Sequence, residues 1–491
     1  MSEIFAAAGQ GRRARMWRAT NVGPNAVNLA GAGVIRARAR DQVRNNPWGS
    51  AALDKLAANG IATGIQAKGV WGSPEHRKAE AALWKRWYAV MDADGTCDGY
   101  AQQALAWREW KEAGEVFVRF RARRESDGLP VPLQVQLIPS EQCPNELYTT
   151  ASNGNSVRAG IEFDLIGRRV AYWMYREHPG DYHQAVNGNE LVRVPADQVE
   201  HVFQPKRAGQ IRGTPDIAPA LMRMFNLDRF ADNVLERQAI ANLFLGFYTQ
   251  KAGEEEDGPE GGQGAPIGDG AEPGADGVQL AGMEPATMQE LPAGMDVKFS
   301  DPPDAGANYS DYMRNGLMEI AATYNIPYEV LTGDLRNISD RALRLILNEF
   351  RRVIEMWQWL TFIPKYCQPI RQRYLDFAVL AGKLDAPAYA ENRVEVAETL
   401  WVPQGWPYSH PVQDVDADIK AIRAGLQSKS STVLARGEDP ERVDEEIAED
   451  NARGDAYGFV LDSDARKTSA AGLTQARSPG TALPDTTGDD A

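Results

Sequence analysis

The stretch "IPYEVLTGDLRNISDRALRLILNEF", Ile326 to Phe350, has helical spacing on both sides of a short polar break. Gly333 and Asn337 can end or turn a helix, because both residue types tolerate left-handed backbone. Ser339 or Asp340 can cap the next helix by accepting its free backbone N–H groups. The break "TGDLRNISDR" has no His, no Cys and no pair of carboxylates at catalytic spacing. We therefore expect a loop that is held at the junction of two long helices.

The helix predicted after this loop is long and amphipathic, and we expect it to end near Pro364. Its apolar positions recur at intervals of 4, 3, 4 and 3: Leu343, Leu347, Phe350, Ile354 and Trp357. Its opposite face is polar and carries Arg344, Asn348, Arg351 and Glu355.

Two further helices are predicted before the loop. The first opens with Thr214 as a candidate cap and Pro215 in its first turn, and continues to Tyr248. At about 1.5 Å per residue it would be roughly 50 Å long, more than most globular domains need. The second runs from Asn308 to Asn325, and one stripe of it is apolar: Met313, Leu317, Ile320 and Tyr324.

The segment between these two helices is unusual. Lys251 to Leu280 holds nine Gly and eight acidic residues without an aromatic side chain, so we expect a mobile loop. The text "LPAGMDVKFSDP" after it is typical of a strand.

The rest of the sequence shows three kinds of pattern. Helical patterns extend from Arg36 to Gly114, and alternating strand patterns with Gly- and Asn-rich turns follow up to about Pro205, which predicts an antiparallel β region. Two or three short helices are expected from Asp414 to Asp450, and a disordered tail after Asn451.

Composition limits the class of protein. A chain of 491 residues should contain two to four substructures. Its three cysteines are odd in number and far apart, which argues against a disulfide framework and fits a reducing compartment. No signal peptide or membrane span is predicted, so we expect a protein that is soluble and intracellular when made.

The net charge of −15 is spread unevenly. Met1 to Arg44 carries eight arginines against Glu3 and Asp41, whereas Glu438 to Ala491 carries 14 acidic and five basic residues. The basic leader could contact nucleic acid, but two solvated ends are the simpler interpretation.

No constellation of residues predicts catalysis. A phosphate-binding G-x-x-x-x-G-K-[ST] loop is absent, and the five histidines have neither metal spacing nor a nucleophile motif beside them. "DADGTCDG", Asp92 to Gly99, lacks the bidentate Glu of a calcium loop and favours a solvated turn between helices. We therefore predict neither an enzyme nor a metal or other cofactor.

Five blocks, in order, resemble the lambda-type phage portal protein family, over roughly Arg36 to Glu449. They are "RARARDQVRNNPWGSAALDKLAANGIATGI", "LIPSEQC", "VRAGIEFD", "VEHVFQPKRAGQIRGTPDIAPAL" and "IPYEVLTGDLRNISDRALRLILNEF". The resemblance implies an α+β portal fold, mainly α-helical, with long stem and tunnel helices and an antiparallel, β-rich wing. It also implies a ring, typically of 12 copies, at one capsid vertex of the virion.

The resemblance assigns parts to the chain in the order found from the residues. These are a basic arm (1–35), wing (36–212), stem helix (213–248), clip (249–307, with the acidic loop 251–280), returning stem helix (308–332), tunnel loop (333–341), tunnel helix and rest of the wing (342–410), crown (411–455) and disordered tail (456–491).

Double-stranded DNA would pass through the ring during packaging and ejection. Partners implied are the terminase large subunit, head-completion or adaptor proteins and the major capsid protein, without a membrane. The candidate DNA-facing residues are Asp334, Leu335, Arg336, Asn337, Ser339 and Arg341 in the loop, with Arg344, Asn348 and Arg351 on the tunnel helix.

Three alternatives stay open at this point. The arginines of the loop could pair with Asp334 or Asp340 instead of DNA. The stem stripe of Met313, Leu317, Ile320 and Tyr324, assigned to subunit contacts, could be ordinary core. At the level of the whole protein, the alternative is a structural ring or scaffold of the virion that never touches DNA.

Overall fold

The computed structural model describes residues 21–181, 190–243, 247–250, 295–298, 309–336, 338–387, 389–408, 410–460, 464 and 466. The chain divides into two compact units. Unit 1 comprises Met1–Ala37, Leu53–Pro215 and Leu335–Ala491, and unit 2 comprises Arg38–Ala52 and Asp216–Asp334. The predicted acidic loop 251–280 lies outside the described residues, as do Arg12, Arg13, Arg15 and Arg18 of the basic arm.

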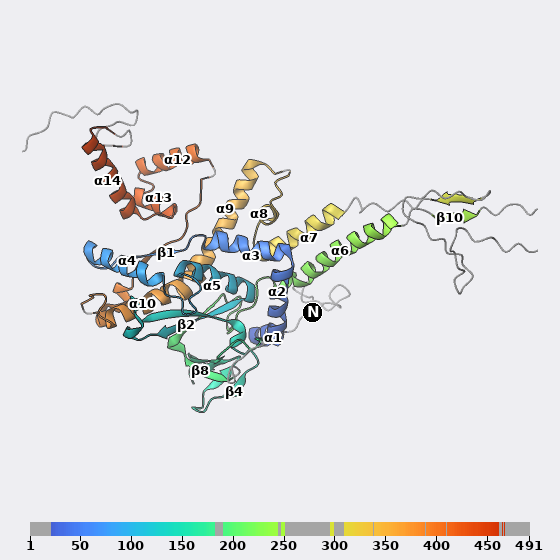
Figure 1. Ribbon diagram of the computed structural model, residues 1–491, viewed down its shortest axis with the longest axis horizontal. Coiled ribbons are helices and arrows are strands. Elements are labelled where there is room, and N and C mark those ends of the chain that lie inside the picture. The colour runs from blue at the N-terminus through green and yellow to red at the C-terminus, as the bar shows by residue number, and fades with distance from the viewer. Residues whose placement is uncertain are drawn as a thin grey trace, which may run out of the picture. The chain divides into compact units, whose positions relative to one another are not determined.

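The described chain is mainly helical with antiparallel sheets, as predicted (Figure 1). The helices before the clip are α1 (Pro24–Ala30), α2 (Ala32–Asn45), α3 (Pro47–Gly60), α4 (Pro74–Tyr88), α5 (Gly99–Ala113) and α6 (Leu221–Leu243). Those after it are α7 (Tyr309–Tyr324), α8 (Tyr328–Thr332), α9 (Asp340–Trp357), α10 (Gln368–Leu380), α11 (Tyr389–Val396), α12 (Pro411–Arg423), α13 (Lys429–Ala435) and α14 (Pro440–Tyr457).

Two antiparallel sheets form the centre of unit 1. One has the order β3 (Leu133–Pro139), β2 (Glu115–Ala122), β9 (Val199–Phe203). The other has the order β4 (Tyr148–Thr150), β5 (Ser156–Arg158), β6 (Ile161–Phe163), β7 (Arg169–Tyr175), β8 (Leu191–Pro195). A buried cluster that includes Phe117, Ile161 and Tyr172 joins their inner faces. Helices α5 and α10 and the π-helical segment η6 (Gln358–Cys367) lie against the three-stranded sheet (Figure 1).

A short strand pair closes unit 1 in a way that the sequence did not predict. β1 (Gln66–Gly69) pairs with β12 (Thr399–Val402), so Gln66 faces Val402 across more than 300 residues of chain. Beside it, α4 packs on α10 through Trp84 and Tyr374, whose ring centroids are 4.8 Å apart. These contacts join parts of unit 1 that are far apart in the sequence.

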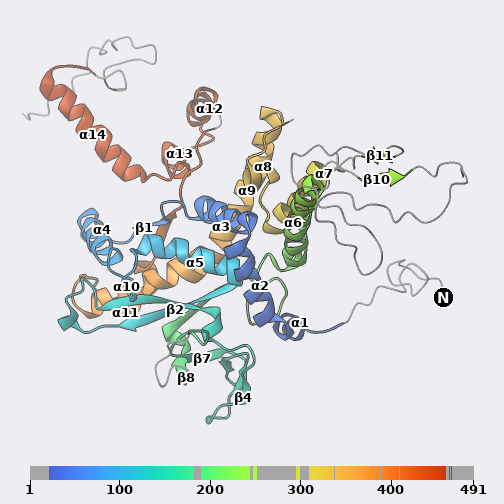
Figure 2. The same cartoon turned by 45° about the vertical axis from the view of Figure 1, so that its right-hand side comes forward.

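Unit 2 contains the predicted stem pair. Helices α6 and α7 lie side by side in both views (Figures 1 and 2), and strands β10 (Phe247–Gln250) and β11 (Met295–Lys298) pair beyond them. The predicted strand before residue 300 is therefore confirmed. The stem helix, however, was predicted too long at both ends.

α6 begins at Leu221 rather than after Thr214. A short 3-10 turn, η5 (Ala218–Ala220), with Pro219 in its first turn, directly precedes it. α6 ends at Leu243, and the aromatic, β-branched text from Phe247 forms β10 instead of a last helical turn.

Two other predicted boundaries are wrong. The tunnel helix does not end near Pro364: η6 contains this proline and continues directly into α10. A wider π turn relieves the clash of the proline ring with the preceding turn. At the other end, α14 continues to Tyr457, where Gly458 with φ of 77° ends it, so residues 452–457 are helical rather than part of a tail.

Asp92 also differs from its prediction. It is buried, and its carboxylate accepts hydrogen bonds from the backbone N–H of Thr96 (2.8 Å) and Nε2 of Gln102 (2.8 Å). The turn from Asp92 to Gly99 is thus anchored by the buried Asp92, while Asp94, Gly95, Thr96 and Asp98 are exposed, as expected of a solvated turn. Among the described residues, no group of three or more His, Cys, Asp or Glu side chains could hold a metal ion.

Candidate functional site

The loop between α8 and α9, predicted to be the tunnel loop, is fixed at both ends by its own sequence. Gly333 ends α8 with φ of 72°, a left-handed conformation that glycine adopts without strain. The carboxylate of Asp334, next to it, accepts a hydrogen bond from the Tyr328 hydroxyl at 3.2 Å. At the other end, Ser339 caps α9 by accepting the backbone N–H of Ala342 at 3.3 Å. The predicted capping role of Ser339 is therefore confirmed.

The predicted DNA-facing side chains of the loop differ in their surroundings. Leu335 is 56% exposed, and Arg336 and Arg341 are exposed as well. Asn337 lies outside the described residues. Asp340 pairs with Arg344 at 2.8 Å and lies 3.3 Å from Nε2 of His410, so the chain already supplies its partners.

The polar face of α9 lies partly against its own chain. Arg351 donates to the carbonyl of Pro407 at 3.3 Å and lies over the Trp406 ring, 5.2 Å from the centroid. Its burial lowers the pKa of the guanidinium. Arg344, Asn348 and Arg351 together line one hollow of about 450 Å³, whose other lining residues include Tyr408, Asp414, Asp418 and Arg436. The sequence interpretation identified the α9 side of this hollow and missed its other wall.

Three of the four predicted stem-interface residues are buried within unit 2. Leu317, Ile320 and Tyr324 are almost fully excluded from solvent, and Met313 is half-buried. Helix α7 approaches α6 closely at Gly316, where an added Cβ would lie 2.8 Å from Cδ1 of Leu227. Subunit contact by this stripe stays a prediction.

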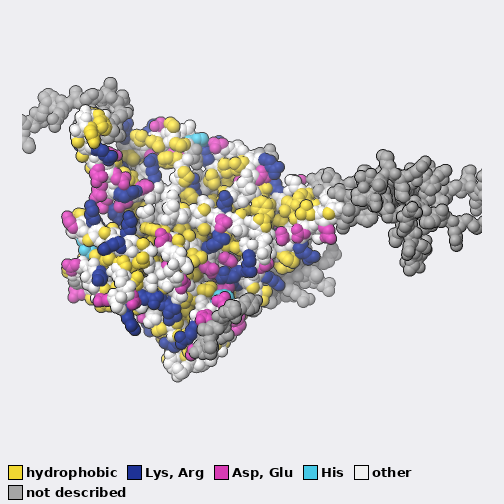
Figure 3. Space-filling model, viewed as in Figure 1, with side chains coloured by type: hydrophobic (Ala, Val, Ile, Leu, Met, Phe, Trp, Pro, Cys, Tyr) yellow, Lys and Arg dark blue, Asp and Glu magenta, His cyan; other side chains and the backbone are white. Residues whose placement is uncertain are grey.

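The same helices expose other apolar side chains. Leu235 on α6 is 68% exposed, and Figure 3 shows hydrophobic side chains gathered on the outer part of the α6–α7 pair. The exposed apolar residues of the pair are Met222, Phe225, Leu235, Tyr312 and Met318.

Three of the blocks that carry the family resemblance meet at one buried carboxylate, Glu115, at the start of β2. Arg212 donates to it from Nη2 at 2.6 Å, and the backbone N–H of Gly213 donates at 2.6 Å. Ser140 donates its hydroxyl to Glu115 and Arg36 lies 3.4 Å away. Arg36 is therefore a buried structural residue, in contrast to the solvated or nucleic-acid-binding leader predicted from the sequence.

The charge states in this network follow from burial and pairing. Burial alone would raise the pKa of Glu115, but Arg212 and His201 hold the pKa well below its usual range. Burial lowers the pKa of His201 to about 3, so the ring is neutral. Its Nε2–H then donates to Glu115 at 2.8 Å, while Nδ1 accepts from Arg169 at 2.8 Å.

Arg212 also hydrogen-bonds the backbone of the blocks "LIPSEQC" and "VRAGIEFD". Its Nη1 donates to the carbonyls of Cys143 at 3.0 Å and Ala159 at 2.7 Å. Sequence reasoning did not single out Glu115, Arg212 or His201. The available signal was a single carboxylate at the start of a strand whose next three residues are apolar, "EVFVRF".

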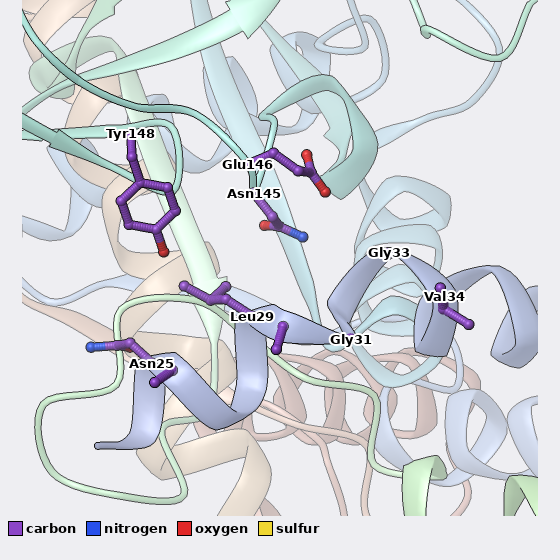
Figure 4. Close-up of a pocket in the computed structure, with 10 residues that line it drawn as sticks. Asn25, Leu29, Gly31, Gly33, Val34, Asn145, Glu146 and Tyr148 are labelled. Atoms are coloured by element: carbon purple, nitrogen blue, oxygen red, sulfur yellow. The ribbon is translucent and has the colours of Figure 1, made fainter. Parts of the chain in front are cut away.

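A separate hollow of about 460 Å³ lies beside α1 and the start of α2 (Figure 4). Leu29 of α1 and Tyr148 of β4 approach it from different sides, and Asn145 and Glu146 border it above (Figure 4). Glu146 is the one charged group of its lining, which gives no basis for selecting a charged ligand.

Comparison with known proteins decides the family. The model described as "Phage portal protein, lambda family" matches residues 10–358. The chain belongs to the lambda family of phage portal proteins. The resemblance inferred from the five blocks is thereby confirmed, and with it a structural role in the phage virion and in DNA packaging.

Curated portal relatives extend over most of the chain. The probable portal protein of Halomonas phage phiHAP-1 is 27% identical over 443 residues, covering 87% of this chain and 81% of the relative. Portal protein B of Escherichia phage lambda is 21% identical over 479 residues, covering 89% and 86%.

Solved structures give weaker similarity to this portal chain. A chain from the neck of a native gene transfer agent particle matches with a TM-score of 0.42 and 14% identity, covering 86% of this chain and 95% of that one. An HK97 family phage portal protein from Corynebacterium diphtheriae matches with a TM-score of 0.30 and 12% identity, covering 63% and 83%. No helix in the described part of this portal chain could cross a membrane.

Proposed function

We propose that this portal chain assembles as a ring, typically of 12 copies, at one capsid vertex, and that the loop 333–341 faces double-stranded DNA in the bore. The observation that supports DNA contact is the loop itself. Its ends are anchored by Gly333 and Ser339, yet Leu335 and Arg336 are exposed between them, and Arg341 is exposed in the first turn of α9. Such a loop can touch a passing duplex without refolding.

The electrostatics of the chain suit a conduit. A strongly basic bore would bind phosphates through counterion release and slow a moving duplex. A chain with a net charge of −15 repels the DNA backbone and leaves contact to a few arginines. The proposed role of Arg336 and Arg341 is a weak, transient contact with phosphate. Asp334, Asn337, Arg344, Asn348 and Arg351 are proposed to line the same passage.

The ring would form between stem and wing surfaces of neighbouring chains. The predicted stripe of Met313, Leu317, Ile320 and Tyr324 is largely occupied within one chain. Exposed apolar side chains such as Leu235 are therefore the better candidates for contact with a neighbouring chain. Assembly would remove their apolar surface from water, which favours the contact.

The clip, residues 249–307, is proposed to dock the terminase large subunit and later the head-completion or adaptor proteins. Its acidic loop 251–280 would attract a basic partner surface. Deleting "EEEDGPEGGQGAPIGDGAEPGADG" should preserve rings and weaken terminase binding in a pull-down with purified terminase. Equal binding by the shortened chain would remove the loop from this role.

The DNA-facing role is tested with the double variant Arg336→Ala, Arg341→Ala. Rings should form normally, since exposed loop residues add little buried area, while packaging and retention of DNA fall. Salt screens this attraction, so the loss should be larger at low ionic strength than at high. The matched control is Arg168→Ala, which removes another exposed arginine from the wing hairpin.

Two outcomes would contradict the proposal. Normal packaging and retention by stable rings of the double variant would leave a structural virion ring without DNA contact. Equal losses from Arg168→Ala would mean that general surface charge, and not the loop, is responsible. Ring formation itself should be tested first, by electron microscopy of the purified chain. The proposal requires a ring with an axial hole wide enough for a duplex.

A further inference from the structure

Three arginines converge on a small hollow at the edge of the two sheets of unit 1. Two of them belong to β2 and one follows β7. The hollow has a volume of about 260 Å³ and is lined by Arg119, Arg121, Met174, Tyr175, Arg176 and Val192. None of these residues belongs to the loop, the α9 hollow or the Glu115 network.

Strand geometry explains why two arginines point into it. Side chains two apart on a strand share a face, so Arg119 and Arg121 lie on the same face of β2 as Phe117. Phe117 is buried in the cluster between the sheets, whereas Met174 of β7 belongs to both that cluster and the hollow. The hollow is therefore the place where the apolar core of the sandwich opens, and the arginines form its polar rim.

The positive charge of this hollow is mostly uncompensated. Arg176 pairs with Glu190 at 3.3 Å, and both side chains are more than half exposed. Arg121 donates to the neutral amide oxygen of Gln136 at 2.9 Å. Asp94 accepts from Nε2 of Gln136, and its charge acts on Arg121, but it lies outside the lining.

Arg119 is the exception among the three. No hydrogen bond or ion pair joins it to any residue in the described ranges, and its buried Nε has no partner there. Burial lowers the pKa of this guanidinium, and the neighbouring charges of Arg121 and Arg176 lower it further. A guanidinium that is held among like charges gains more from an arriving anion than an exposed one would.

We propose that this hollow is a binding site for a small multivalent oxyanion of the phosphate type. Its walls supply guanidinium groups from Arg119, Arg121 and Arg176, whose planar donors match the oxygen spacing of phosphate. A volume of about 260 Å³ holds one such ion with a few waters of about 30 Å³ each. The size excludes a duplex, which would need an extended basic surface.

The phosphate group could be a free ion or the end of a larger molecule, and the two sources require different probes. Inorganic phosphate represents the free ion and glycerol 3-phosphate represents an end group. Titration calorimetry of the full chain with each probe should give saturable binding, and sodium chloride at the same ionic strength should give none.

Arg119→Gln is the deciding variant. It removes one charge-assisted contact, so the affinity for phosphate should fall about tenfold or more. The substitution also removes a charge held among like charges, so the melting temperature without phosphate should stay the same or rise. The matched control is Arg123→Gln, an exposed arginine of the same sequence run that bonds Gln134 outside the lining.

The possible results separate cleanly. Binding of both probes by wild type and Arg123→Gln, weakened about tenfold or more in Arg119→Gln, supports an end-group site. The same pattern with inorganic phosphate alone supports a free-ion site. Absence of saturable binding to wild type overturns the proposal. Equal affinities of Arg119→Gln and wild type, or equal losses in both variants, overturn it as well, since the hollow would then not be responsible.

Discussion

The guanidinium of Arg212 and the carboxylate of Glu115 meet at 2.6 Å in a place where both side chains are almost completely excluded from water. Each group therefore depends on the other for charge compensation. Removing one partner of such a buried pair costs far more than the pair contributes, because the remaining charge stays buried without compensation.

Glu115→Gln should consequently lower the free energy of unfolding by about 3–5 kcal/mol. Urea unfolding followed by circular dichroism measures this loss. The matched control is Glu441→Gln, which removes a more exposed carboxylate paired with Lys68 and should cost about 0–1 kcal/mol. Equal costs for the two variants would contradict the assigned role of the buried pair.

His201 predicts a dependence of stability on pH. Its folded-state pKa of about 3 lies below the ordinary value of 6.5. Between these two pH values, His201 is protonated in the unfolded chain and its imidazole is neutral in the folded chain. This contribution is present above about pH 6.5 and is lost as pH falls toward 3, with a limiting slope of about 1.4 kcal/mol per unit. His201→Gln keeps an N–H donor and should flatten the slope between about pH 5 and 6.5, as measured by urea midpoints.

Glu200, the neighbouring residue on β9, acts with the opposite sign. Burial raises its pKa to about 7, although Arg373 and Lys365 oppose the shift. The native carboxyl keeps a proton that the unfolded chain has lost, so its contribution declines as pH rises from about 4.5 to 7. Glu200→Gln should therefore steepen the rise of stability with pH relative to wild type. A parallel pH profile in this variant would show that Glu200 is ionised in the folded chain.

The close approach of α7 to α6 at Gly316 predicts a packing defect on substitution. Gly316→Val would force side-chain atoms into the space of Leu227, and overpacking of this kind costs about 1–3 kcal/mol. Asn315→Val places the same side chain on the exposed neighbouring position and serves as the control. Combining Gly316→Val with Leu227→Ala should cost less than the sum of the two single changes, measured by thermal melting.

Ring assembly and subunit folding can be separated on the stem helices. Leu317→Asp buries a charge within one chain and should lower the melting temperature before any effect on assembly is seen. Leu235→Asp changes an exposed residue and should leave the melting temperature unchanged while reducing the fraction of rings in mass photometry. Rings of normal abundance from Leu235→Asp would remove this face of α6 from the interface.

Local patterns in the sequence predicted the helices and the antiparallel strands well, since periodicity reports which face of an element is buried. The apolar stripe through Leu317 and Ile320 was correctly placed on one face of a helix. Periodicity does not say what covers that face. In this chain α6 covers it at least in part, through Leu227.

Long-range relationships were missed for a different reason. The four residues of β1 carry no strong strand pattern, and their pairing with β12 depends on chain that lies more than 300 residues away. Glu115 and Arg212 likewise appear as single charges in the sequence. Their importance comes from a common buried location that no spacing rule reports.

The pairing of Gln66 with Val402 sets a limit on when unit 1 can be completed during synthesis. A ribosome synthesises the chain from its N-terminus, so β1 emerges long before its partner and stays with an unpaired edge. All of α6 to α11 is made within that interval. The strand pair thus closes only after Val402 has been translated, and a product truncated before this residue would keep the unpaired edge of β1.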